Sequence, residues 1–83
     1  MQHLEDIKKI LGEVLGLGDR QNALTADSGL LGSIPEFDSM AVINVLTALE
    51  EHFGIAVDDD EISALTFETV GTVLQFVEEK LAQ

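Results

Sequence analysis

The chain has 83 residues, carries 16 acidic side chains against four lysines and arginines, and contains no cysteine. The missing cysteine excludes disulfides, thiolate metal sites and a thiol nucleophile of the protein's own, and the net charge of −12 argues against nucleic acid and anionic membranes as partners. With 46% apolar residues in periodic order, the chain is too hydrophobic for disorder, and we expect one domain over residues 1–83.

The first predicted element is a helix over residues 4–15. Its apolar residues recur at separations of three and four, which is the spacing of one helix face. They are Leu4, Ile7, Ile10, Leu11, Val14 and Leu15. The glycines within residues 16–18 should end this helix.

A long loop is predicted over residues 17–38. Turn-forming residues are dense there and include Pro35, the only proline of the chain. Loops of this length in compact domains are usually functional or disordered, but this one has apolar side chains that can attach it to the core. They are Leu24, Leu30, Leu31, Ile34 and Phe37.

A second helix should begin after Asp38, a good N-cap residue, and end at Gly54. Its core-facing residues again lie three or four apart and comprise Val42, Val45, Leu46, Leu49 and Phe53. Either Asp58 or Asp59 is suited to cap a short third helix that ends near Leu65.

The last helix should follow a threonine cap, Thr66 or Thr69, and end near Lys80. One face carries Val70, Val73, Leu74, Val77 and Leu81, with Phe67 and Phe76 adding bulk. Residues 55–57 have strand-like composition, but a single strand has no partner elsewhere in the chain. The predicted fold class is all-α: a small antiparallel four-helix bundle of three main helices and one short helix, with a long loop between helices one and two.

Ser39 lies where the long loop meets the second helix. The first turn of a helix has unpaired N–H groups, and the helix dipole favours an anion there. A phosphate ester on Ser39 would therefore be well placed. The alternative is that Ser39 is only the first helical residue behind an Asp38 cap, because the tripeptide 38–40 recurs by chance in many proteins.

The order of features resembles the acyl carrier protein family over essentially the whole chain. The motifs that carry the resemblance are DSGLL at 27–31, DSM at 38–40 and LEEHFGI at 49–55. The resemblance implies that Ser39 receives 4'-phosphopantetheine from coenzyme A through a phosphopantetheinyl transferase, with Asp38 and Met40 as the flanking motif. It also implies that the arm carries acyl intermediates as thioesters and presents them to partner enzymes.

The resemblance makes the second helix the main partner surface, and the acyl-loading and acyl-accepting enzymes are expected to have basic docking surfaces. The residues expected on this surface are Ala41, Ile43, Asn44, Thr47, Glu50 and Glu51. Met40 and Ile43 leave two interpretations open: both turn inward against the loop, or both form an apolar docking patch. Ala41 and Asn44 stand where housekeeping carriers have acidic residues. Together with the run 30–37, they resemble carriers from bacterial surface-polysaccharide and exosortase-type loci.

Two other functions would suit the same features of the sequence. A carrier of aminoacyl or polyketide intermediates would use Ser39 in the same way, and an acidic helical interaction module would leave it unmodified. Catalysis is not expected, because His52 lies about 20 Å from Ser39 along the predicted helix. The acidic run 58–61 lacks calcium-loop spacing and is interpreted as a solvated surface, so no metal is expected.

No apolar stretch approaches the roughly 20 residues that a membrane-spanning helix needs. The N-terminal residues also lack the basic-then-apolar order of a signal peptide. We therefore expect a cytoplasmic monomer.

Overall fold

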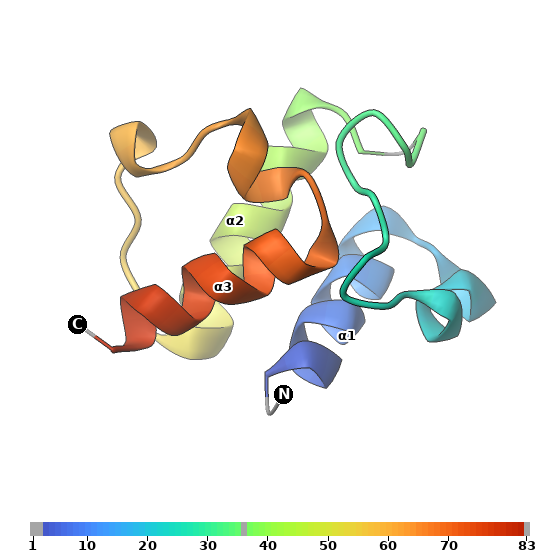
Figure 1. Cartoon of the computed structure of the whole chain (residues 1–83), viewed down its shortest axis with the longest axis horizontal. Coiled ribbons are helices and arrows are strands. Elements are labelled where there is room, and N and C mark those ends of the chain that lie inside the picture. The colour runs from blue at the N-terminus through green and yellow to red at the C-terminus, as the bar shows by residue number, and fades with distance from the viewer. Residues whose placement is uncertain (1–2, 36, 83) are drawn as a thin grey trace.

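The computed structural model describes residues 3–35 and 37–82; Glu36 of the run 30–37 lies outside the described residues. Three α-helices form the bundle: α1 (Leu4–Leu15), α2 (Ser39–Phe53) and α3 (Val70–Leu81). Three short 3-10 helices lie in the connections: η1 (Gly18–Ala23), η2 (Asp59–Glu61) and η3 (Ala64–Phe67). Figure 1 shows α3 crossing in front of α2, with α1 on the side of the long loop. The predicted all-α class, with three main helices, is confirmed.

The C-terminal end of α1 and both ends of α2 agree with their sequence signals. Asp38 is the N-cap of α2, and its Oδ1 accepts a hydrogen bond from the Ala41 N–H at 2.9 Å. Gly16 and Gly54 follow α1 and α2 with φ of 66° and 67°, a left-handed conformation that is easy only for glycine. The predicted bounds of both helices are therefore confirmed.

The connections differ from the prediction in two places. The long loop begins with the 3-10 helix η1, and the single short helix expected to end near Leu65 is instead η2 and η3. Ile62 and Ser63, which lie between η2 and η3, are extended. Each 3-10 turn is capped by hydrogen bonds between its own residues and the residue before it. The Asp58 N–H donates to Glu61 Oε1 at 3.2 Å, and the Ser63 N–H donates to Thr66 Oγ1 at 3.2 Å. These local bonds favour two single turns over one continuous helix.

The last helix uses the second of the two candidate caps. Thr69 Oγ1 accepts from the Thr72 N–H at 3.1 Å, and the Thr69 N–H donates to Thr72 Oγ1 at 3.0 Å. Because this reciprocal pair satisfies two N–H groups, α3 begins at Val70.

The core lies between the three helices and the long loop. Its fully buried side chains include Ile7, Leu11, Leu30, Val45, Leu49, Val70, Val73 and Val77. Burial of one such side chain contributes about 1.5–3 kcal/mol to stability. Leu24, Leu30 and Phe37 attach the loop to this core as predicted, whereas Leu31 is 41% exposed and does not.

The backbone of the long loop is joined to the start of α3. Leu30 and Leu31 donate N–H bonds to the carbonyls of Glu68 and Phe67, at 2.9 and 3.0 Å. In return, the Val70 and Gly71 N–H groups donate to carbonyls of residues 28 and 26. The loop therefore has a defined path, which leads to Ser39. Within residues 3–35 and 37–82, no helix is long and apolar enough to cross a membrane.

Candidate functional site

Ser39 is the first residue of α2, and its side chain is exposed. The Asp38 cap fixes the start of the helix, and the Val42 N–H makes a bond to Asp38 O at 3.0 Å. The first turn that follows contains no acidic residue. The hydroxyl therefore lies at the positive end of a helix dipole and in solvent, where a phosphate ester is favoured.

A cavity of about 350 Å³ lies directly beside Ser39. Its lining comprises Leu31, Ser39, Val42, Ile62, Ser63, Ala64 and Phe67. Apart from the two serines, these side chains are apolar. The cavity thus has the chemistry of a binding site for a hydrocarbon chain, with a hydroxyl at its edge for attachment.

Two contacts fix the inner wall of this cavity. The rings of Phe37 and Phe67 meet edge to face, with their centroids 5.8 Å apart. The Phe67 carbonyl also accepts the Leu31 N–H bond, which holds the loop against η3. The cavity is therefore built by segments from three parts of the chain, which sequence analysis alone could not bring together.

The residues expected on the partner surface fall into two groups. The first group is exposed and comprises Ile43, Asn44, Thr47 and Glu51. Met40 is exposed as well, and the exposed fractions of Met40 and Ile43 are 63% and 57%. This exposure contradicts the interpretation in which both turn inward against the loop. From Met40 to Leu49, α2 presents no charged side chain at all.

Ala41 requires correction, whereas the partner role of Glu50 stays a prediction. Ala41 is 8% exposed and belongs to the core, because it shares a helix face with Val45 one turn later. Glu50 is half-buried, and its carboxylate accepts the Val57 N–H bond at 2.9 Å. Ala41 therefore packs in the core and does not face a partner, whereas Glu50 makes one contact within the chain and stays partly exposed.

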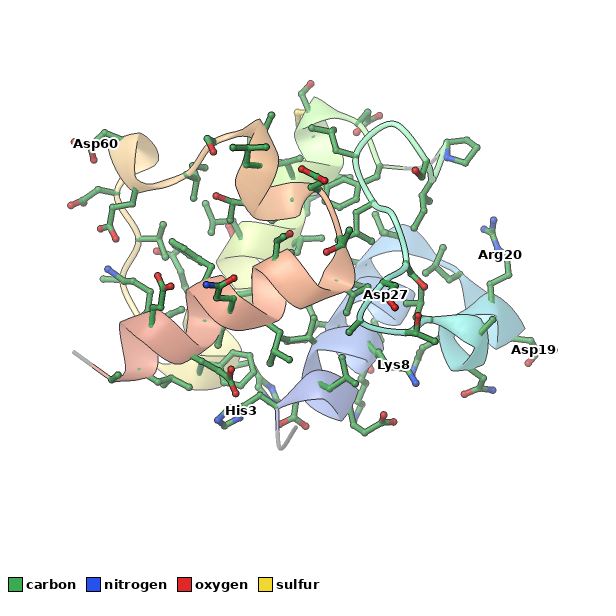
Figure 2. The ribbon with its side chains drawn as sticks, viewed as in Figure 1. His3, Lys8, Asp19, Arg20, Asp27 and Asp60 are labelled. Carbon is green, nitrogen blue, oxygen red and sulfur yellow. The ribbon has the colours of Figure 1, made fainter. Side chains whose placement is uncertain are left out.

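Both histidines lie at the other end of α2 from Ser39, because the rings of His3 and His52 each contact Phe53. His52 lies in the last turn of α2, with its Nε2 3.7 Å from Asp6 Oδ2 on α1 and its ring against Phe53. Within the described part of the chain, no group of three or more such side chains is arranged to hold a metal ion. Figure 2 shows Asp19, Arg20 and Asp60 projecting from the rim of the molecule.

One contact near the site was not predicted. Lys80 Nζ on α3 donates to Glu61 Oε2 on η2 at 2.7 Å. This bond and a backbone bond from Asp58 lower the pKa of Glu61 below its ordinary value of 4.5, against a smaller opposing effect of burial. The two residues lie 19 positions apart, so no helical or strand spacing could have indicated the pair.

Comparisons with known proteins agree on one family. Residues 5–77 match the family described as "Phosphopantetheine attachment site". An acyl carrier protein from Helicobacter acinonychis is 34% identical over 99% of this chain and 100% of its own length. One from Thermotoga maritima is 29% identical over 90% of this chain and 86% of its own length. A solution NMR structure of a holo acyl carrier protein from Nitrosomonas europaea is 65% identical, covers both chains completely and has a TM-score of 0.93.

Proposed function

Because the chain belongs to the phosphopantetheine attachment site family of acyl carrier proteins, we propose that its covalent 4'-phosphopantetheine is attached to Ser39. The protein carries acyl groups on this arm and acts with partner enzymes. Its family is one of carriers, not of catalysts.

The observation that carries the proposal is the position of the Ser39 hydroxyl. It is exposed at the start of α2 and at the edge of an apolar cavity. Exposure gives a transferase access to the hydroxyl oxygen, which attacks the pantetheine-side phosphorus of coenzyme A. The pyrophosphate P–O bond breaks, 3',5'-adenosine bisphosphate leaves, and the serine proton passes to a base of the transferase. Asp38 holds the first turn in place, and the cofactor supplies the thiol that a chain without cysteine lacks.

The lining of the cavity supports an aliphatic acyl cargo. Leu31, Val42, Ile62 and Phe67 offer hydrocarbon contact, and the serine hydroxyls lie among them. An aminoacyl or polyketide carrier would use Ser39 in the same way, but a charged aminoacyl group would lose its hydration in this cavity. The observation therefore favours a hydrocarbon chain as cargo.

The proposed partner surface is the exposed face of α2 next to Ser39, made of Met40, Ile43, Asn44, Thr47 and Glu51. Its partners are a phosphopantetheinyl transferase and the acyl-loading and acyl-accepting enzymes. The uncharged first turns of α2 support apolar contact at the centre of this surface. Basic docking surfaces on the partners would meet the acidic residues around it. A specialised polysaccharide or exosortase-type locus stays a prediction.

The test is the intact mass of the protein before and after incubation with coenzyme A and a broad-specificity phosphopantetheinyl transferase. The wild-type chain should gain one phosphopantetheinyl group, and Ser39→Ala should gain none. Ser63→Ala is the matched control, because Ser63 lines the same cavity but should remain unmodified. A folded, initially unmodified wild-type chain that gains no mass would favour the acidic interaction module instead.

A further inference from the structure

The segment 58–63 leads from the end of α2 towards η3 and lies at the edge of the molecule. Figure 2 shows Asp60 projecting from its tip. Glu61 connects this segment to α3, because Lys80 Nζ donates to its carboxylate at 2.7 Å. The Lys80 side chain is only 12% exposed and lies against the protein, whereas its partner Glu61 remains open to solvent.

The residues after Glu61 form part of the wall of the cavity. Ile62, Ser63 and Ala64 all line it, and Ile62 also packs against the core. Ile62 is extended, with φ of −109° and ψ of 152°. Because Ile62 is bonded directly to Glu61, the position of the Glu61 backbone determines where this side of the wall lies.

We propose that the Glu61–Lys80 ion pair holds the segment 58–63 towards α3 and thereby keeps Ile62 in the wall of the open cavity that receives the acyl cargo. The proposal rests on the attachment of that cargo through Ser39. When the pair breaks, the segment moves outwards, Ile62 leaves the wall, and the cargo becomes accessible. The Glu61 side chain is 30% exposed, so its carboxylate regains water when the pair breaks. The Lys80 side chain is 12% exposed, so the loss of this partner is costly for its ammonium and favours the intact pair.

Two substitutions break the pair from opposite sides. Glu61→Gln removes the charge but keeps a side-chain oxygen that can accept the Asp58 N–H bond. Lys80→Met removes the ammonium but keeps a stem of similar length. Lys8→Met is the matched control for Lys80→Met, because it gives the same change in net charge. The Lys8 side chain is 15% exposed, and its Nζ lies 3.4 Å from Glu5 Oε2. Figure 2 shows Lys8 on the opposite side of the molecule from Asp60.

The first measurement uses the unmodified chain and requires no cofactor. Backbone amide order parameters over residues 58–63 should fall from about 0.85 towards about 0.6 in Glu61→Gln and Lys80→Met, the change from rigid to flexible backbone. Lys8→Met should leave them unchanged. Unchanged values in the first two variants, or an equal fall throughout the chain, would overturn the proposal.

The second measurement uses the acyl-loaded protein and records how fast hydroxylamine cleaves the thioester. Cleavage should be several-fold faster in Glu61→Gln and Lys80→Met than in the wild type, and unchanged in Lys8→Met. Equal rates in all four proteins would show that the pair does not protect the cargo. If no variant gains the arm, the proposed function itself fails, whereas the order parameters still report on the segment.

Discussion

The carboxylate of Asp38 accepts a hydrogen bond from the Ala41 backbone N–H at 2.9 Å, so the residue that precedes the candidate attachment serine also caps α2. Asp38→Ala should lower the free energy of unfolding by about 1 kcal/mol, because one N–H group of the first turn loses its acceptor. Urea denaturation monitored by circular dichroism measures this change.

Asp38→Asn is the control for the cap, because asparagine is an equally good N-cap residue. It should retain most of the stability that Asp38→Ala loses. Equal destabilisation by both substitutions would mean that the charge of Asp38, rather than its hydrogen bond, stabilises the start of α2.

Ile43 and Ala41 lie two positions apart on α2 but on different faces. Ile43→Gln should change the free energy of unfolding by no more than about 0.5 kcal/mol, because the side chain is exposed. Ala41→Gln should cost about 1–3 kcal/mol, because the core has no space for the larger side chain. Thermal or urea unfolding of the two variants gives the comparison.

The Ile43→Gln variant also tests the proposed partner surface. Ile43→Gln should slow phosphopantetheinylation several-fold at unchanged stability, because it removes an exposed apolar contact beside Ser39. The initial rate of mass gain measures this effect. An unchanged rate would exclude Ile43 from the surface that the transferase contacts.

Gly71 has no room for a side chain. Its N–H donates to Ala26 O at 2.8 Å, and a Cβ at this position would lie 2.8 Å from the same oxygen. Gly→Ala in a helix usually stabilises by up to about 1 kcal/mol, but Gly71→Ala should destabilise by about 1–3 kcal/mol. The midpoint of urea unfolding should fall.

Gly12 is the contrasting case within α1. A Cβ there would meet the Gln21 side chain from its amide oxygen back to Cγ, and this side chain, unlike the Ala26 backbone, can change its rotamer. Gly12→Ala should therefore be neutral or stabilising in the same assay. A loss as large as that of Gly71→Ala would show that Gln21 cannot move.

Glu61 gives the chain a pH-dependent contribution to stability. Its pKa is lowered in the folded protein by the hydrogen bond from Lys80 and then by the bond from Asp58. A lowered carboxylate pKa stabilises the fold above the ordinary value of 4.5, and this contribution is lost as the pH falls through the lowered value.

The stability difference between the wild type and Glu61→Gln measures this contribution, because the other carboxylates cancel. The difference should be constant near neutral pH and shrink below pH 4.5. Urea unfolding at a series of pH values provides the measurement. A difference that grows with acidity would contradict a lowered pKa.

The helices were predictable from sequence because their signals are local. Apolar residues three and four positions apart predicted α1 and α2, and the caps at Asp38 and Gly54 predicted the ends of α2. The bounds of both helices were correct. Ala41 was assigned to the wrong face because alanine is small enough for either environment. The two faces of α2 were therefore distinguishable only once its packing against the core was known.

The cavity and the Glu61–Lys80 pair were not predictable, for a different reason. Both depend on segments that meet only in the folded chain, and neither has a sequence period. Segment 58–63 carries too few apolar residues to indicate which side it packs on. The candidate attachment serine, which stays a prediction, was indicated by the family resemblance and by its place at the junction of a loop and a capped helix.

The backbone bonds between residues 26–31 and residues 67–71 have a consequence for the order of folding. During synthesis on the ribosome, α1 can form as soon as its own residues have emerged, whereas the loop before Ser39 must wait for the start of α3. Contacts so distant in sequence form late and slow the folding of a small helical domain. The segment that leads to Ser39 therefore becomes ordered only after residues 67–71 have emerged from the ribosome.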